Sequence, residues 1–208
     1  MHFLISAGPT REYLDPVRFI SNGSTGKMGF ACARAAARRG HKVTLIAGPV
    51  YLEKPRGVKL IRVITAGDML QAMLKHFDKS DCVIMTAAVN DYRPRNPKKY
   101  KIQKTDRPFT LVLERTEDVL AELGRRKQKQ VLIGFAVQDK AARTNARRKL
   151  KQKNLDAVVL NSPAAMGADR SIVELLQAGK KWIRLPLKNK TAIAKKLIQL
   201  AEQISRNR

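Results

Sequence analysis

The sequence has few of the residues that would suggest a secreted, metal-binding or membrane protein. Its 208 residues include only two cysteines and three histidines, with no Cys-x-x-Cys pair and no histidine cluster. We therefore expect Cys32 and Cys82 to be reduced, buried thiols, and we expect no metal held by protein side chains alone. No apolar run approaches the roughly 20 residues of a membrane-spanning helix, and the first residues lack a signal-peptide pattern. These absences predict a cytoplasmic protein without a membrane partner.

Acidic and aromatic residues are also scarce, which bears on the choice of partner. The chain has 42 Lys and Arg against 17 Asp and Glu, a formal net charge of +25. Such a charge attracts polyanions without regard to sequence. However, aromatic residues make up only 5% of the chain and are not interleaved with the basic runs, and no nucleic-acid reader motif is present. The charge predicts anionic partners in general, and it gives no support for a specific nucleic acid.

Apolar runs alternate with helical patterns along the chain, and this order predicts the fold. Runs typical of strands cover residues 2–7, 42–47, 59–63, 81–86, 109–114, 131–136 and 157–160. Helical patterns cover residues 25–39, 66–77, 118–126, 140–153 and 190–205. The alternation is typical of an α/β, Rossmann-like protein with a mostly parallel sheet and helices on both faces. Runs at 171–176 and 181–185 flank a short turn and predict a C-terminal β-hairpin, and we expect one domain over residues 1–208.

Residues 6–29 join the first predicted strand to the first predicted helix and have the composition of an anion-binding loop. Their glycines allow a ligand and neighbouring backbone to approach closely, and Ser24 or Thr25 is expected to cap the helix. Helix N-termini favour anions because their first N–H groups have no partner within the helix. The segment is neither a P-loop, since Met28 stands where Ser or Thr is needed, nor a G-x-G-x-x-G fingerprint. On these residues alone, an ordinary glycine-rich turn stays open.

Residues 90–108 interrupt the alternation. The stretch contains three prolines and many Lys and Arg residues, and it has little periodicity. It follows predicted strand 81–86, at the end where open α/β sheets place their ligands. Because connections this long are usually lids, arms or disordered segments, we expect a basic flap or arm at about 90–108. A solvated basic loop is the alternative.

Five motifs stand in order along the chain. They are A-G-P-T-R-E-Y-L-D-P-V-R-F-I-S-N-G-S-T-G-K-M-G at 7–29, A-A-V-N-D-Y-R at 87–93, K-I-Q-K at 101–104, G-F-A at 134–136 and A-R-R-K-L-K-Q-K-N-L-D at 146–156. Together they resemble the phosphopantothenate–cysteine ligase (phosphopantothenoylcysteine synthetase) family over nearly the whole chain. In many bacteria this is the synthetase half of a bifunctional coenzyme A biosynthesis flavoprotein, fused behind a flavin-dependent decarboxylase.

The resemblance implies a ligase that joins 4′-phosphopantothenate to L-cysteine on the route to coenzyme A. The phosphopantothenate carboxylate attacks the α-phosphate of a nucleotide, CTP or ATP, and pyrophosphate leaves. The cysteine amine then attacks the acyl-nucleotidylate and forms the amide. Mg²⁺ would enter with the nucleotide, and no flavin is expected in this chain. The resemblance also implies a homodimer and leaves room for a separate flavin-dependent decarboxylase partner.

The resemblance implies roles for individual residues as well. Asn22 is expected to donate to the acyl oxygen as cysteine attacks, Arg18 to orient a carboxylate in that step, and Lys101 to belong to a flap over the nucleotide. The nucleotide is expected to contact Asp91, Lys101, Phe135, Lys149, Lys153 and Asp118. The substrate is expected to contact Asn22, Ser24, Gly26 and Ala88. In the family, the segment of Ala88 reaches the pantothenate site from the neighbouring subunit.

Two other interpretations stay open beside the ligase. Tyr100 and Lys104 have the Y-x-x-x-K spacing of an NAD(P)-dependent Rossmann oxidoreductase, although they lie in a Pro/Lys-rich stretch where that pair requires a helix. The charge also suits a basic nucleotide- or nucleic-acid-binding paralogue without catalytic activity. Gln103, which replaces a lysine in the family's flap motif, favours weaker flap closure.

Overall fold

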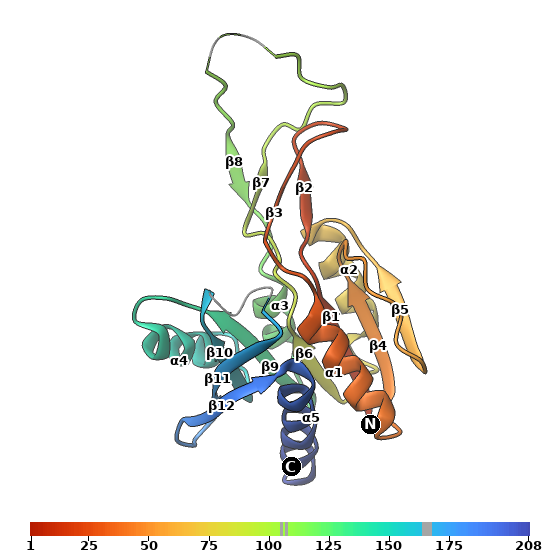
Figure 1. Ribbon diagram of the computed structural model, residues 1–208, viewed down its shortest axis with the longest axis vertical. Coiled ribbons are helices and arrows are strands. Elements are labelled where there is room, and N and C mark those ends of the chain that lie inside the picture. Colours follow the sequence, from red (N-terminus) through yellow and green to blue (C-terminus); the bar gives the residue numbers. More distant parts are fainter. Residues whose placement is uncertain (105, 107, 164–167) are drawn as a thin grey trace.

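A single twisted sheet forms the centre of the molecule (Figure 1). The computed structural model describes residues 1–104, 106, 108–163 and 168–208. Its eight-stranded sheet has the order β12-β11-β10-β9-β6-β1-β4-β5, and neighbouring strands are parallel except in the pairs β10–β11 and β11–β12. The strands are β1 (His2–Ala7), β4 (Lys42–Ala47), β5 (Val58–Arg62), β6 (Cys82–Met85), β9 (Val131–Val137), β10 (Ala157–Asn161), β11 (Arg170–Gln177) and β12 (Ile183–Asn189).

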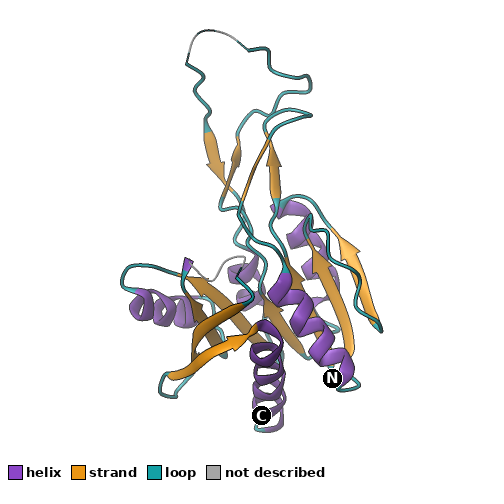
Figure 2. Cartoon of the chain, in the orientation of Figure 1, coloured by secondary structure: helices purple, strands orange, loops and turns teal. Residues whose placement is uncertain are grey.

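Five helices among the described residues cover the two faces of the sheet (Figure 2). They are α1 (Lys27–Arg38), α2 (Ala66–Phe77), α3 (Val119–Arg126), α4 (Ala142–Gln152) and α5 (Lys190–Arg206). Alternate strand residues point to opposite faces, so Phe3 and Ile5 pack with α1 and α5, whereas Leu4 packs with α2, α3 and α4. The prediction of an α/β fold with a mostly parallel sheet and a C-terminal hairpin is confirmed.

Helix starts follow from local capping residues in three cases. Thr65 and Asp68 form a capping box at α2, Asp118 accepts the Ala121 N–H at α3, and Asn189 accepts the Ala192 N–H at α5. The start of α1 differs from the prediction. Its N-cap is Gly26 in the left-handed region (φ +73°), and no side chain caps it, so the expected cap by Ser24 or Thr25 is wrong.

An arm of four short strands rises from one end of the sheet (Figure 1). Strands β2 (Arg11–Tyr13) and β3 (Phe19–Ser21) form one antiparallel pair, and β7 (Tyr92–Pro94) and β8 (Leu113–Arg115) form another. The predicted strand over 109–114 is therefore corrected, because only its last residues are extended and they pair within the arm instead of the central sheet. The predicted flap or arm at 90–108 contributes β7 to this arm, and its residues 105 and 107 lie outside the described residues.

The chain reverses its direction of progress across the sheet between β1 and β6. From β1 it continues outward through β4 to β5, and it then returns to β6 on the other side of β1 and continues to β9 and β10. The segments that leave the carboxyl ends of β1 and β6 run side by side, joined by hydrogen bonds from the Thr10 N–H to the Ala88 carbonyl and from the Ala88 N–H to the Gly8 carbonyl. This change of direction is the place where open α/β sheets bind ligands. Cys32 and Cys82 are buried and unpaired, as predicted. Within the described ranges, no helix combines the length and apolarity needed to cross a bilayer.

A buried carboxylate joins the last helix to the end of the first. Glu202 on α5 is 7% exposed, accepts two 2.7 Å hydrogen bonds from the Arg39 guanidinium, and lies 2.7 Å from His41 Nε2. The hydrogen bond from Arg39, helped by that from His41, outweighs burial and lowers the pKa of Glu202 from 4.5 to about 2. The ionised form of Glu202 is therefore part of the folded state.

Glu202→Gln should lower the free energy of unfolding by about 2 kcal/mol at pH 7, because the charge-assisted bonds are lost. A carboxylate with a lowered pKa stabilises the fold above its unfolded pKa, near 4.5, and this contribution disappears as the pH falls toward about 2. Urea unfolding at pH 7 and pH 3 should show a difference that shrinks at the lower pH. Glu53→Gln, at an exposed position, is the control, and an equal difference at both pH values would contradict the role of Glu202.

Candidate functional site

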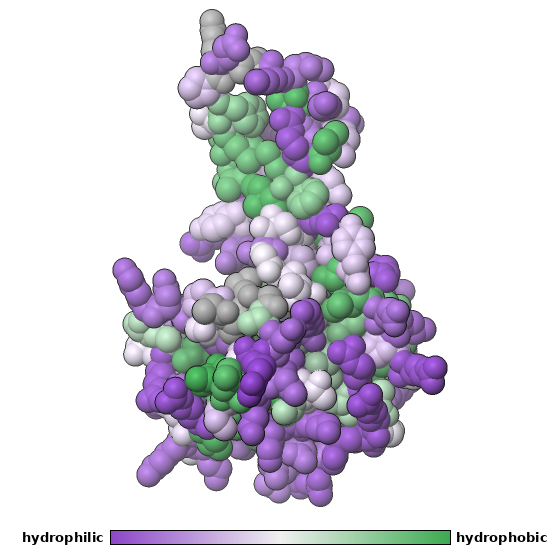
Figure 3. Space-filling view, in the orientation of Figure 1, coloured by the Kyte–Doolittle hydropathy of each residue, from purple (hydrophilic) through white to green (hydrophobic). Residues whose placement is uncertain are grey.

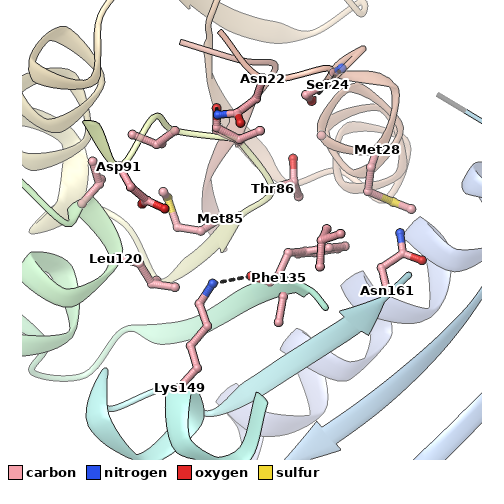
Figure 4. Close-up of a pocket in the computed structure, with 18 of the residues that line it drawn as sticks. Asn22, Ser24, Met28, Met85, Thr86, Asp91, Leu120, Phe135, Lys149 and Asn161 are labelled. Carbon is pink, nitrogen blue, oxygen red and sulfur yellow. Dashed lines mark hydrogen bonds between the residues drawn. The ribbon is translucent and has the colours of Figure 1, made fainter. Parts of the chain in front are cut away.

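A cavity of about 500 Å³ opens where the chain changes direction between β1 and β6 (Figure 4). Its walls come from the loop before α1, the first turn of α1, the segment after β6, the loop before α3, the end of β9, and helix α4. The lining combines lysines, carboxylates and amides with a few apolar side chains. The cavity therefore offers both cationic and hydrogen-bonding groups to a polar ligand.

The first turn of α1 contributes backbone donors to this cavity. Because no side chain caps α1, its first N–H groups are available to an anion, and the helix dipole favours negative charge there. Gly29 lets the helix lie close to the sheet, since a Cβ at this position would come within 2.5 Å of Ala7 Cβ and 2.8 Å of the Ser6 carbonyl. The predicted anion loop thus has its helix terminus at a cavity.

A chain of amide hydrogen bonds fixes Asn22. The Asn90 side chain is buried, and its Nδ2 donates to the carbonyls of Thr10 (3.2 Å) and Ile20 (3.1 Å), which leaves its Oδ1 as an acceptor. Asn22 Nδ2 donates to that oxygen at 2.9 Å and to the Ala88 carbonyl at 3.1 Å. Both N–H groups of the Asn22 amide therefore donate hydrogen bonds within the protein. A ligand that accepts a bond from Asn22 must replace one of these two acceptors, and the bond to the Ala88 carbonyl is the more exposed of the two.

Lys149 is the most perturbed cation of the cavity. Its Nζ donates to the Phe135 carbonyl at 2.6 Å (dashed in Figure 4). Burial first, and then the charge of Lys153, lower the pKa of Lys149 to about 8, although Asp118 and Asp91 act in the opposite direction. An anion beside Lys149 would favour its protonated form, so the cavity is electrostatically prepared for negative charge.

The Asp118 carboxylate has two hydrogen-bond partners. Its carboxylate caps α3 through the Ala121 N–H at 2.9 Å and also accepts a hydrogen bond from Lys153 Nζ. Although burial alone would raise the pKa of Asp118, the bonds from Lys153 and Ala121 lower it. Lys153 is therefore paired with a carboxylate, whereas Lys149 donates its hydrogen bond to a carbonyl oxygen.

Two lysines that begin helices lie in the cavity wall and escaped the sequence predictions. Lys27, the first residue of α1, pairs with Asp169 at 2.6 Å, and this bond lowers the pKa of Asp169. Lys190, the first residue of α5, donates through Nζ to the Ala168 carbonyl. Lys27 lies inside the 7–29 motif, so the sequence could have indicated it as a site residue. Lys190 lies far from every motif in the sequence, so nothing in the sequence indicated it. Asn161 and Thr86 also line the cavity, and sequence reasoning assigned them no role.

The structure brings together most of the predicted site residues. Those that line the cavity are Asn22, Ser24, Gly26, Ala88, Asp91, Asp118, Phe135, Lys149 and Lys153. Arg18 and Lys101 do not line it, because both lie in the arm, where Arg18 donates to the carbonyl of Ile102 at 2.6 Å. The geometry thus divides the predicted residues into a cavity group and an arm pair.

The oxidoreductase interpretation receives no support from local geometry. Tyr100 and Lys104 lie in an irregular segment of the arm and not on a helix, so the structure does not place them in the way that the Y-x-x-x-K pair requires. Among the residues that the structure describes, no three His, Cys, Asp or Glu side chains form a group that could hold a metal ion.

Comparisons with known proteins identify the family. The family of the DNA/pantothenate metabolism flavoprotein C-terminal domain matches residues 1–204. The coenzyme A biosynthesis bifunctional protein CoaBC of Bacillus subtilis strain 168 is 44% identical over 99% of this chain and 52% of its own length. A cysteine/cysteine sulfinic acid decarboxylase from an unknown prokaryotic organism is 41% identical over 94% of this chain and 56% of its own length.

A solved structure agrees with these relatives. The crystal structure of the C-terminal domain of a CoaBC protein has a TM-score of 0.87 and 39% identity, and the match covers 100% of this chain and 96% of that one. The chain thus spans about half the length of the curated relatives it matches. The family expected from the motifs is confirmed, and the chain belongs to the family of the DNA/pantothenate metabolism flavoprotein C-terminal domain.

Proposed function

We propose that this chain is a phosphopantothenate–cysteine ligase that uses CTP. The observation that carries the proposal is the cavity at the β1/β6 switch point, where the 7–29 motif and the lysines of α4 face one space. The names of the similar CoaBC proteins, which refer to coenzyme A biosynthesis, support it. A cytoplasmic location and a separate flavin-dependent decarboxylase partner remain predictions.

The first step joins two anions, so it requires cations. A carboxylate oxygen of 4′-phosphopantothenate attacks the α-phosphorus of CTP, and the bond to pyrophosphate breaks. The first turn of α1, together with Lys149 and Lys153, would hold the triphosphate, and Mg²⁺ would arrive as part of the nucleotide substrate. Asp91, Asp118 and Phe135, which line the same cavity, would contact the nucleotide as well. Neutralisation of the triphosphate lowers the repulsion that the attacking carboxylate meets.

The second step forms the amide. The cysteine amine attacks the acyl carbon of the acyl-cytidylate, CMP leaves with the bonding electron pair, and the amine loses a proton. Asn22 would exchange its bond to the Ala88 carbonyl for one to the acyl oxygen, on which negative charge develops. Ser24 and Gly26 would position the pantothenate part beside it. Asn22 then acts through a donor that Asn90 already orients.

The arm supports the proposal of a homodimer. Large side chains on it are 40–67% exposed, namely Val17, Phe19, Tyr92, Tyr100, Phe109, Val112 and Leu113. Figure 3 shows a band of hydrophobic surface on the arm, and we call this exposed set the apolar band. A contiguous apolar surface of this kind is typical of a protein interface. A second copy of the chain would bury it and would bring a second Arg18–Lys101 pair into the assembly.

Asn22→Asp should separate the two steps. The variant should still release pyrophosphate from CTP and 4′-phosphopantothenate, whereas amide formation should fall about 100-fold, the effect of losing one oxyanion donor. Mass spectrometry should detect the trapped acyl-cytidylate. Asn96→Asp makes the same change at an exposed position of the arm and is the control. Full amide formation by Asn22→Asp would remove Asn22 from this role, and wild-type protein that releases no pyrophosphate with any nucleotide would refute the ligase.

Nucleotide affinity should depend on pH through Lys149. Because its pKa is about 8 and the protonated amine binds phosphate, the Kd for CTP should rise up to about tenfold per pH unit above pH 8. Calorimetric titrations between pH 7 and 9.5 measure this slope. Lys149→Arg keeps the charge at all these pH values and should flatten the slope. The same slope in wild type and Lys149→Arg would assign the titration to another group.

Charges placed in the apolar band should dissociate the dimer. Phe109→Glu combined with Val112→Glu should convert it to a monomer in light scattering, because both side chains are more than half exposed in a single chain. Ile183→Glu combined with Leu187→Glu is the matched control, since these side chains of β12 have comparable exposure. Dissociation by the control pair alone, or a wild-type monomer, would refute an interface on the arm.

A further inference from the structure

A buried carboxylate in the arm has more hydrogen-bond partners than its turn requires. Asp15 lies between β2 and β3, and its side chain is 0% exposed. It accepts five hydrogen bonds, from the N–H groups of Val17, Arg18 and Ile102 and from Nε and Nη2 of Arg18. None of the steps proposed above uses this carboxylate, so its position requires a separate explanation.

The two carboxylate oxygens of Asp15 have different tasks. Oδ1 accepts the N–H groups of Val17 (2.9 Å) and Arg18 (2.8 Å), which is the usual way in which Asp stabilises its own turn. Oδ2 accepts Arg18 Nε (3.0 Å) and Nη2 (2.6 Å) and the N–H of Ile102 (3.1 Å), a residue 87 positions away. The first oxygen shapes the hairpin, and the second joins the hairpin to the other half of the arm.

Arg18 closes a ring with the same two partners. Its Nη2 also donates to the Ile102 carbonyl at 2.6 Å, so Ile102 is held through both its N–H and its C=O. A backbone–backbone hydrogen bond joins the same segments, from the Lys98 N–H to the Leu14 carbonyl at 2.8 Å. Burial alone would raise the pKa of the Asp15 carboxyl, but the bonds from Val17, Arg18 and Ile102 hold it well below its usual range. The carboxylate stays ionised while it holds the ring.

We propose that Asp15 is a positioning residue that holds Arg18 and the segment of Lys101 together as one unit. Lys101 directly precedes Ile102, so the bonds to Ile102 limit where its side chain can reach. The inference rests on the proposed function and on the roles that the family resemblance implies for Arg18 in amide formation and for Lys101 over the nucleotide. Arg18 has a flexible side chain that an exposed hairpin would leave disordered, and its fork of donors is oriented here before any ligand binds. The arm then presents the two cations in a fixed relation.

Asp15→Asn tests this proposal because it can keep the hydrogen bonds within the turn and remove those that join the two halves of the arm. The amide oxygen can still accept the Val17 and Arg18 N–H groups, but its NH₂ group would face the guanidinium and the Ile102 N–H, donor against donor. Hydrogen exchange of residues 96–104, followed by mass spectrometry, should become at least tenfold faster while the central sheet stays protected. Asp78→Asn, the same change at an exposed position outside the arm, should exchange like wild type.

The reaction steps provide the second readout. In Asp15→Asn the KM for CTP should rise, because Lys101 is expected to contact the nucleotide, and amide formation should fall at least tenfold. Loss of folded protein alone would lower the apparent kcat and leave the KM for CTP unchanged. If wild-type protein releases no pyrophosphate, the ligase proposal fails, but the exchange measurement still decides whether Asp15 joins the two halves of the arm.

Ile102→Pro keeps the test decisive if Asp15→Asn does not fold. This variant removes the Ile102 N–H and leaves the Asp15–Arg18 pair intact. Faster exchange of residues 96–104, with retained exchange protection of the sheet, is the expected result. Wild-type exchange and wild-type amide formation in either variant would overturn the proposal.

Discussion

The buried side chain of Asn90 is the constraint on which the candidate site depends. It lies just after the end of β6, and it binds the carbonyls of Thr10 and Ile20, which belong to the loop after β1 and to the arm. Thr10 Oγ1 in turn accepts the Asn90 N–H at 2.9 Å. The segment after β1, strand β3 and the segment after β6 are thereby fixed to one another. Without this contact, the Asn22 amide would have no defined direction toward the cavity.

The electrostatics of the cavity show a second constraint. Lys149 and Lys153 repel each other, and burial adds to the cost of charging Lys149. Asp118, which also pairs with Lys153, and Asp91 offset part of this cost, and Asp169 pairs with Lys27 in the cavity wall. These carboxylates stand where a polyanionic ligand would compete for the same cations. Ligand binding therefore exchanges internal ion pairs for external ones, and the net gain depends on how many phosphate oxygens replace each carboxylate.

The central sheet could be predicted from the sequence because its signals are local. β1 and α2 have the predicted bounds, since a short apolar run and a capped amphipathic pattern define them. The strands β2, β3, β7 and β8 could not be predicted, because three residues carry no periodicity and each pair is defined by its partner strand. The predicted N-cap of α1 was wrong because Gly26 occupies that position in the left-handed region, and composition does not reveal this conformation.

The candidate site could likewise be predicted only in part from the sequence. Physical reasoning from the residues reached an anion-binding helix terminus, whereas the roles of Asp91, Phe135 and Lys149 came from the resemblance to a family. The low pKa of Lys149 could not be predicted, because it depends on burial against strands distant in sequence. Lys190 lacked any local signal, since only the return of α5 to the sheet brings it to the cavity.

The separation of the arm from the cavity limits how the proposed ligase can work. Arg18 and Lys101 do not line the cavity of their own chain, so either the arm moves toward that cavity or it serves the cavity of a second copy. The bonds of Asp15 join both halves of the arm, so Arg18 and Lys101 would have to move together in the first case. In the second case the apolar band would be buried at the same time. Because burial of that band favours association whereas movement alone leaves it exposed to water, the second copy that we propose would account for both observations.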